Sequence, residues 1–226
     1  MKLEKVTNKP GRKYHDACGA AHGLDLIGER WALLVMRELM FGPRRFGDLK
    51  KDLCGLSANV LTQRLEGLEA SGIVQRRKLP PPASVQVYEL TEWGRELKPI
   101  FALLGHWAAR SPTHDPALPL SPVSVVMSLE TMFDAAKAGG ARVDVGLRFG
   151  DESFRIRIAD GVLGAERAEA EGADVVFDTL PPVLAGAVYG GAPLAGLEAE
   201  GALRLSGDRS LAERFTTFFA LPPKAF

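Results

Sequence analysis

The stretch from Phe46 to Tyr88 constrains the fold of this chain most, because it contains four structural elements in a telling order. Apolar residues spaced as on a short helix run over Phe46–Leu53. Ser57 is a good N-cap for a second helix, since its hydroxyl can accept a backbone N–H. Two strands follow over 73–79 and 85–90, joined by a proline-rich tip. Helix, turn, helix and hairpin in this order are typical of a winged helix-turn-helix.

The second helix of this pattern presents polar side chains opposite its apolar residues. With Leu61, Leu65 and Leu68 in the core, a rotation of about 100° per residue turns Asn59 and Gln63 away from the protein. Their amides can each form two hydrogen bonds with adenine. Because such a helix fits the major groove of B-DNA, double-stranded DNA is the expected partner. An ordinary solvated helix face is the alternative.

Further candidate DNA contacts surround this helix. Ser57 and Thr62 near its start can contact a base or a phosphate, and Arg64 at its side is expected to reach a phosphate. Basic side chains position a duplex through its phosphates without reading the base sequence. Those around the first helix are Arg44, Arg45, Lys50 and Lys51, and those in the hairpin are Arg76, Arg77 and Lys78.

The zero net charge of the chain hides two halves of opposite sign. Up to Thr113 there are 18 Lys and Arg against 12 Asp and Glu, and from His114 onward there are 10 against 16. A basic first half suits a polyanion, whereas an acidic second half would repel DNA. Between them, the four prolines of Ser111–Pro122 favour an extended connection. We therefore expect two domains, 1–113 and 114–226.

Two more helices are predicted in the first half. One spans Leu24–Met40, and the other follows Thr91, which can cap it. The second has a large apolar stripe formed by Leu97, Phe101, Leu104 and Trp107. Such a stripe packs either on its own domain or against a second copy of the chain.

The second half alternates helix and strand signals, which indicates an α+β fold. Helices are predicted over 123–138, 180–189 and 210–219, and strands over 142–149, 153–158, 174–178 and 203–206. Ligand cavities are mostly apolar, and a solid core is the alternative for the same side chains. The candidate pocket residues are Met127, Phe133, Leu184, Val188, Phe215, Phe218 and Phe219.

The two cysteines do not form a disulfide scaffold, which favours a reduced, cytoplasmic protein. Cys18 lies near His15, His22 and Lys13, and neighbouring cationic groups make a thiol reactive. Because free cysteine is commonly buried, we favour a buried structural role for Cys18 over a reactive one. Cys54 sits at the turn and is expected to pack against the core.

The sequence offers little catalytic chemistry. It lacks HExxH, a glycine-rich phosphate loop and GxSxG, and Asp151 and Glu152 lie in a predicted hairpin where carboxylates are usually solvated. No apolar run approaches the roughly 18 residues of a membrane span, and no secretory signal opens the chain. We expect no enzyme, cofactor or metal site, since His15, His22, His106 and His114 lack metal-ligand spacing.

Residues 18–110 resemble the winged-helix transcriptional regulators of the HxlR type. The matching pieces are a cysteine before LDLIGERWALLVMRELMFGPRRFGDL, then LSANVLTQRLEGLEASGIVQRR and VYELTEWGRELKPIFALLGHWA. The resemblance implies a homodimer whose outer helices pair and whose reading helices face successive major grooves. It also implies, for Cys18, the sensing of oxidants or electrophiles that some members perform. The tip PPPASVQVY lacks the arginine that the family usually carries there.

The segment from Val143 to Leu221 resembles the sterol-carrier-protein-type (SCP2-like) lipid-binding fold. The resemblance lies in GADVVFDTLPPVLAGAVYGGAPLAGLEAEGALRLSGDRSLAERF, and it implies a curved sheet whose helices enclose an apolar cavity. The main expectation is a dimeric DNA-binding transcriptional regulator whose second domain is either a sensor for a small apolar or lipid-like effector or an added dimer surface. The alternatives are a lipid carrier, an enzyme with its site in the second domain, and an electrophile sensor acting through Cys18 alone.

Overall fold

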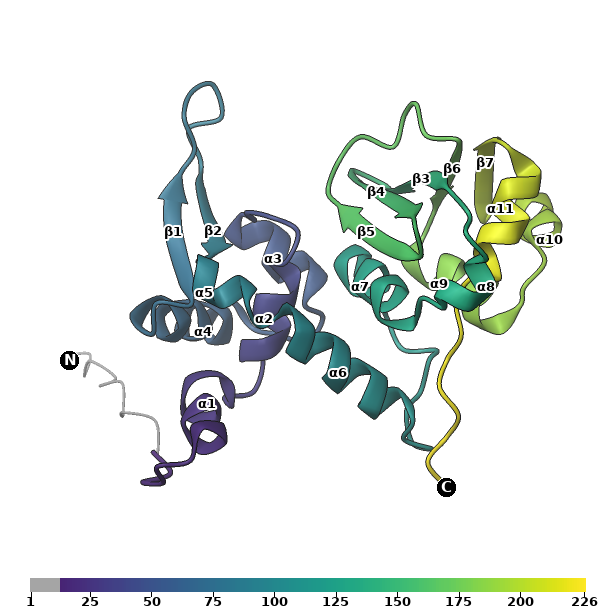
Figure 1. Cartoon of the computed structure of the whole chain (residues 1–226). Helices are drawn as coiled ribbons and strands as arrows, with labels where there is room; N and C mark the ends of the chain where they lie inside the picture. Colours follow the sequence, from purple (N-terminus) through teal and green to yellow (C-terminus); the bar gives the residue numbers. More distant parts are fainter. Residues whose placement is uncertain (1–12) are drawn as a thin grey trace.

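The described chain, residues 13–226 of a computed structural model, forms two units that pack against each other (Figure 1). The N-terminal unit combines six helices with a two-stranded hairpin. Its elements are α1 (Gly19–Ile27), α2 (Ala32–Glu38), α3 (Phe46–Asp52), α4 (Ala58–Ala70), β1 (Val74–Lys78), β2 (Gln86–Leu90), α5 (Glu92–Arg95) and α6 (Lys98–Ala109).

The expected winged helix-turn-helix is confirmed. The Ser57 hydroxyl accepts a hydrogen bond from the Val60 N–H and begins α4 as an N-cap, and the three leucines of α4 are buried. Strands β1 and β2 pair antiparallel, with Val74 opposite Leu90. The backbone of Arg44 forms a further bridge to Tyr88 of β2, so the chain entering α3 is fixed to the wing.

The single helix predicted over Leu24–Met40 is wrong, because the chain turns between Gly28 and Trp31. Helix α1 ends at Ile27, and α2 begins only after Trp31, whose φ of 80° is left-handed. A bulky residue adopts that conformation only where its surroundings hold it there. Apolar periodicity continued across this turn and concealed it.

Thr91 begins a helix as expected, but that helix is the short α5. The Thr91 hydroxyl accepts a hydrogen bond from the Gly94 N–H, and the chain then bends at Leu97 into α6. A Cβ at Gly94 would lie 2.3 Å from the Ile73 carbonyl oxygen. The absence of a side chain therefore lets α5 pack directly on the base of the wing.

The C-terminal unit is a five-stranded sheet with helices. Its elements are α7 (Pro122–Met132), α8 (Ala135–Ala138), β3 (Val143–Phe149), β4 (Glu152–Ala159), β5 (Val162–Glu166), β6 (Val175–Thr179), α9 (Pro181–Gly190), α10 (Leu194–Ala199), β7 (Leu203–Gly207) and α11 (Arg209–Thr216). The strand order is β5-β4-β3-β6-β7, and β3 and β6 are parallel while the other neighbouring pairs are antiparallel. Helix α7 contacts β5, and α11 contacts β6 and β7.

Most predicted elements of this unit are present, with three differences. The helix expected over 123–138 divides at Phe133, whose extended backbone bridges to Phe219, and Asp134 then caps α8. Strand β5 and helix α10 were not predicted, because their short, glycine-containing sequences carry weak apolar patterns.

One hydrophobic core runs through both units. Helix α7 contacts α2 and α6, and the Phe41 ring meets the Phe154 ring edge-on at 5.6 Å. The end of the chain returns to α6, where the Lys224 ammonium donates hydrogen bonds to the carbonyls of Ala109 and Ser111. From Lys13 onward, no helix is long and apolar enough to cross a membrane.

Candidate nucleic-acid interface

Helix α4 presents the polar face that the sequence predicted. Asn59, Thr62 and Gln63 are exposed, as is the capping residue Ser57. The Thr62 hydroxyl donates to the Ala58 carbonyl at 3.1 Å, and the Ser57 hydroxyl already accepts the Val60 N–H at the start of the helix. The amides of Asn59 and Gln63 are therefore the groups of this face best suited to read base edges.

Arg64 is held at the side of α4. Its guanidinium lies 3.1 Å from the Glu29 carboxylate in the turn between α1 and α2, and its side chain is only 20% exposed. This arrangement ties the reading helix to that turn. Reaching a phosphate would require the pair with Glu29 to open.

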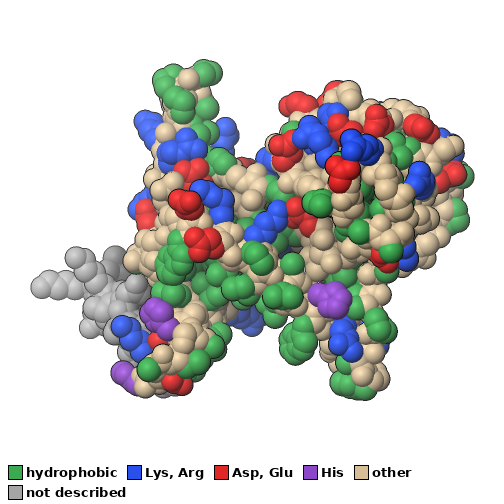
Figure 2. Space-filling view, viewed as in Figure 1, with side chains coloured by type: hydrophobic (Ala, Val, Ile, Leu, Met, Phe, Trp, Pro, Cys, Tyr) green, Lys and Arg blue, Asp and Glu red, His purple; other side chains and the backbone are tan. Residues whose placement is uncertain are grey.

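The wing carries exposed cations along β1, on the projecting hairpin of Figure 2. Arg76 pairs with Glu69 of α4 at 2.9 Å, and Arg77 pairs with Glu89 of β2 at 2.9 Å. Hydrogen bonding to these carboxylates raises the pKa of both arginines, so both remain charged. Lys78, nearer the tip, is exposed as well. Half-exposed guanidiniums of this kind can exchange a carboxylate for a phosphate.

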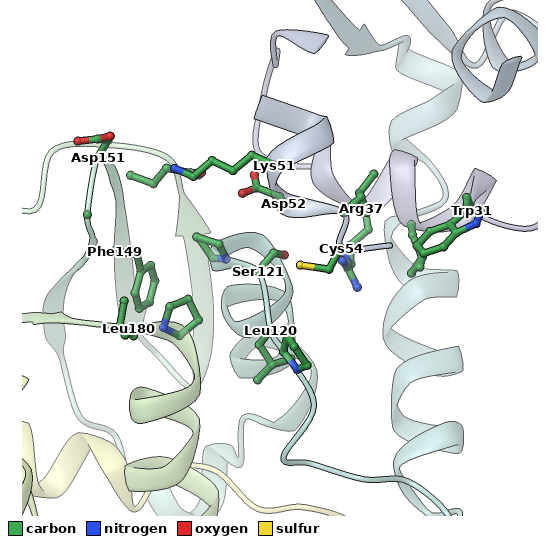
Figure 3. Close-up of a pocket in the computed structure, with 17 residues that line it drawn as sticks. Trp31, Arg37, Lys51, Asp52, Cys54, Leu120, Ser121, Phe149, Asp151 and Leu180 are labelled. Atoms are coloured by element: carbon green, nitrogen blue, oxygen red, sulfur yellow. The ribbon is translucent and has the colours of Figure 1, made fainter. Parts of the chain in front are cut away.

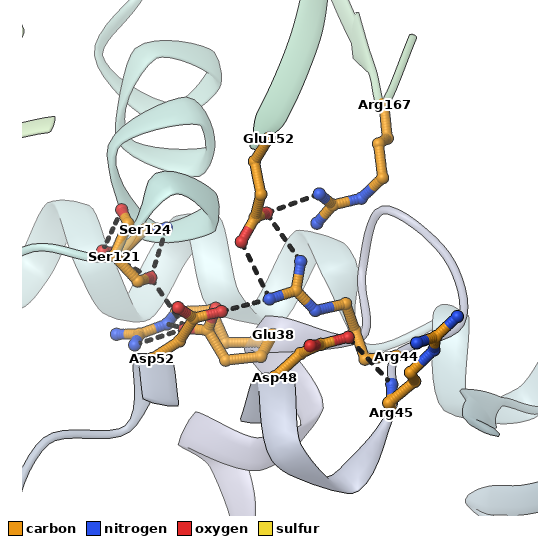
Figure 4. Close-up of polar contacts among 10 residues, drawn as sticks. Glu38, Arg44, Arg45, Asp48, Asp52, Ser121, Ser124, Glu152 and Arg167 are labelled. Atoms are coloured by element: carbon orange, nitrogen blue, oxygen red, sulfur yellow. Dashed lines mark hydrogen bonds and ion pairs between the residues drawn. The ribbon is translucent and has the colours of Figure 1, made fainter. Parts of the chain in front are cut away.

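The expected DNA contact at Arg44 is wrong, because this side chain is buried at the junction of the two units (Figure 4). Its guanidinium donates to Glu152 at 2.6 and 2.9 Å and also pairs with Asp52. Glu152 comes from β4 of the C-terminal unit, where Arg167 pairs with it too. A cation with 6% of its surface exposed cannot meet a phosphate.

The neighbouring basic residues differ in their exposure. Arg45 is exposed at the start of α3, and its backbone N–H donates to the Asp48 carboxylate at 3.3 Å. Lys51 is exposed, while Lys50 is half-buried. Arg45 and Lys51 thus remain available to a polyanion.

The pKa values of Asp52 and Glu152, the two carboxylates that pair with Arg44, are shifted in opposite directions. Burial and the nearby Glu152 and Glu38 carboxylates raise the pKa of Asp52 to about 6, although Arg44 opposes the shift. Arg44 and Arg167 hold the pKa of Glu152 below its ordinary value despite burial. The sequence indicated a solvated Glu152, and this was wrong because the turn before β4 faces the N-terminal unit.

A second polar cluster lies beside the first. Glu38 is fully buried and accepts hydrogen bonds from Arg37 at 2.6 Å and from the Ser121 hydroxyl at 2.8 Å. Ser121 also caps α7 through the Ser124 N–H. Glu38 therefore connects α2 to the first helix of the C-terminal unit.

The buried roles expected for the cysteines are wrong. Cys18 is exposed at the N-cap of α1, where the N–H groups of Ala21 and Ala20 lower the pKa of its thiol. Cys54 is exposed as well, in the turn between α3 and α4. Helix starts favour a thiolate because their N–H groups point toward it, so Cys18 has the environment of a reactive thiol.

The expected cavity of the C-terminal unit is not shown. The Phe215 ring lies 5.0 Å from the Phe219 ring and 5.7 Å from the Phe177 ring, and Phe218 is fully buried beside them. Met127, Val188 and Leu184 are also buried, while Phe133 is half-buried against the core. A hollow beside Leu184 has no volume for a water molecule. Packed side chains thus occupy the region where the sequence predicted a ligand pocket.

Comparison with known proteins agrees with the geometry of the N-terminal unit. Residues 26–115 match the model of the HxlR-like helix-turn-helix family. The chain is 37% identical over 83 residues to the HTH-type transcriptional regulator YodB of Bacillus subtilis, covering 37% of this chain and 74% of YodB. The chain belongs to the HxlR-like helix-turn-helix family.

A further relative and a solved structure of YodB match a similar share of the chain. An uncharacterised HTH-type transcriptional regulator of Synechocystis, sll1512, is 42% identical over 83 residues, which cover 37% of this chain and 62% of that protein. The solved structure of reduced YodB is 32% identical, with a TM-score of 0.40 over 44% of this chain and all of that one.

The C-terminal unit matches a different family. Residues 115–226 match the model of the alkyl sulfatase C-terminal domain. The two matched segments meet at residue 115. The expected sheet domain with helices is confirmed for this unit, whereas its sterol-carrier-type resemblance stays a prediction. Among the residues from Lys13 onward, no group of three His, Cys, Asp or Glu is arranged to hold a metal.

Proposed function

We propose that this chain is a DNA-binding transcriptional regulator that acts as a homodimer. The observation that supports DNA reading best is the exposed amide pair of Asn59 and Gln63 on the capped helix α4, beside a wing that carries Arg76 and Arg77. The helix enters the major groove in this proposal, and the wing lies along the phosphates. The HxlR-like relatives are named as HTH-type transcriptional regulators, which supports the same role.

The apolar face of α6 supports the homodimer. Leu97 and Phe101 of the predicted stripe pack on the core, whereas Leu104 and Trp107 are exposed. Leu104 and Trp107 form a contiguous apolar face with Ile100 and Leu103, which are 52% and 73% exposed. Such a face marks an interaction site, and a two-fold dimer would bury it against itself.

Selection of operator DNA tests this function. A library of random duplexes is passed over the full-length protein, and bound sequences are footprinted. We expect an enriched site with two half-sites about 34 Å apart, one helical turn of DNA. Binding of all duplexes with equal affinity, or of none at low salt, would contradict the proposal.

For the C-terminal unit we propose ligand binding that modulates DNA affinity, rather than catalysis. The excess of Asp and Glu over Lys and Arg in residues 114–226 is poorly suited to DNA. The unit also shares a buried polar junction with the N-terminal unit. The match to a domain of alkyl sulfatases favours an effector with an apolar part. An effector changes DNA affinity only if it binds one arrangement of the protein better than another.

Thiol sensing through Cys18 is a second candidate function, favoured by the exposure of this thiol and its lowered pKa. The test compares release of operator DNA by diamide for the wild type and for Cys18→Ser, with Cys54→Ser as a matched control. Sensing through Cys18 predicts that only the first substitution abolishes release. Unchanged release in Cys18→Ser would contradict it.

A further inference from the structure

A cavity of about 480 Å³ lies between the two units (Figure 3). Its walls come from α2 and the residue before it, the end of α3, the linker before α7, the turn between β3 and β4, and the start of α9. Ligand sites occur preferentially at such junctions and have volumes of about 300–1,000 Å³. This cavity is separate from the aromatic core where the sequence placed a pocket.

The cavity has an apolar wall built from both units. Trp31 and Leu34 come from the N-terminal unit, and Leu120, Phe149 and Leu180 come from the linker and the C-terminal unit. Leu34 and Leu180 are 37% and 63% exposed, so large apolar surface faces solvent here. The left-handed backbone of Trp31 places its ring in this wall, and strained residues cluster at functional sites.

The charges around the cavity are largely neutralised by protein partners. Asp52 and Glu152 both line it, but Arg44 pairs with each and Arg167 pairs with Glu152. Arg37 is paired with the buried Glu38. The remaining charged lining residues, Lys51 and Asp151, are exposed and of opposite sign. A ligand that fits this lining needs no net charge.

We propose that this cavity binds a small, uncharged, mainly apolar molecule and that its occupancy changes the affinity for DNA. The second part rests on the proposed regulatory function. The coupling runs through Arg44, which is held by two carboxylates of the cavity wall and whose backbone is paired with Tyr88 of the wing. A ligand that separates or tightens the two walls moves the wing relative to α4.

Binding is tested first, without DNA. The probe is N-phenyl-1-naphthylamine, an uncharged apolar fluorophore, and the anionic 1-anilinonaphthalene-8-sulfonate is the charged comparison. We expect saturable fluorescence enhancement by the neutral probe, weaker binding of the anionic one, and protection of Cys54 from iodoacetamide, because the Cys54 thiol lies in the cavity wall.

Leu180→Glu is the informative variant, since it places a charge in the apolar wall without touching the core. Its matched control is Leu118→Glu, an equally exposed leucine of the linker that does not line the cavity, with 61% exposure against 63%. We expect about a tenfold loss of probe affinity in Leu180→Glu, because its charge is desolvated by the bound probe, and none in Leu118→Glu. Equal affinity in both variants, or unchanged alkylation of Cys54, would overturn the site.

The regulatory part is tested by titrating the same probe into the complex of the protein with its selected operator. A shift in operator affinity that is lost in Leu180→Glu supports coupling. If the probe binds and protects Cys54 but operator affinity stays constant, the site stands and the coupling is wrong. If no operator can be selected, the proposed function fails while the binding result still decides the site.

Discussion

The Arg44 side chain joins the two units, because Asp52 belongs to α3 and Glu152 to β4. Removing one partner of a buried charge cluster leaves the others unpaired away from water, which is strongly destabilising. In an isolated winged domain the same arginine would lack Glu152 and would face solvent more freely. Its role here therefore depends on the C-terminal unit.

Arg44→Ala tests that role. We expect the substitution to lower the free energy of unfolding by about 3–5 kcal/mol, since Asp52 and Glu152 lose their shared cation. The exposed neighbour Arg45→Ala is the matched control and should stay within about 0.5 kcal/mol of the wild type. Urea denaturation measures both. Equal stability of the two variants would show that the junction contributes little.

The raised pKa of Asp52 predicts that the free energy of unfolding depends on pH. Because its pKa is raised from 3.8 to about 6, the folded protein binds a proton there more tightly than the unfolded chain does. The contribution of Asp52 to stability therefore falls as the pH rises from about 4 to about 6, where the carboxylate ionises in the folded state.

Asp52→Asn removes this titration. We expect the difference in unfolding free energy between the wild type and Asp52→Asn to move by about 2 kcal/mol, against the wild type, between pH 4 and pH 7. Urea denaturation across that range gives the slope, which matters more than the absolute stability. A constant difference would mean that Asp52 has an ordinary pKa.

At the scale of elements, local chemistry explains which predictions were confirmed. Ser57 caps α4, and the three leucines of that helix repeat with helical spacing, so its start and its buried face were predictable. The break before α2 was not predictable, because Trp31 adopts a left-handed backbone that only the surrounding protein selects. Strand β5 pairs only at the sheet edge and has a short, weakly patterned sequence.

The candidate DNA-contacting residues also include some that local sequence predicts and some that it does not. Exposure of Asn59 and Gln63 follows from helical geometry alone, and it was predicted. The burial of Arg44 depends on Glu152, which lies 108 residues away in the chain. No local pattern contains such a partner, and the basic residues around α3 looked alike in sequence.

Helix α6 tests the homodimer at this scale. We expect Leu103→Glu to produce monomers, because it places a charge at the centre of the exposed apolar face, where the wild-type leucine is 73% exposed. Leu118→Glu in the linker is the control and should leave the dimer intact. Sedimentation velocity distinguishes these states. A monomeric wild type, or a dimer that persists in Leu103→Glu, would contradict pairing through α6.

At the scale of the whole molecule, the two units are not independent. The core is continuous from α2 through α7 to the sheet, and the C-terminal residues return to the end of α6. The unit matched to the alkyl sulfatase C-terminal domain is thus in contact with Arg44, whose backbone is paired with Tyr88 of the wing, and with the proposed dimer helix α6. A ligand that changes the packing at the junction could therefore displace the wing or helix α6 through direct contacts.

The most direct test of DNA reading by α4 compares affinities for the selected operator and for unrelated duplex over a range of salt concentrations. We predict that Asn59→Ala and Gln63→Ala each weaken operator binding by about 1–3 kcal/mol at one base pair while leaving nonspecific affinity and salt dependence unchanged. Arg76→Ala should weaken both kinds of DNA alike and flatten the salt dependence, and Arg142→Ala on the C-terminal unit should change neither. Full discrimination retained in the double variant Asn59→Ala/Gln63→Ala would contradict the account.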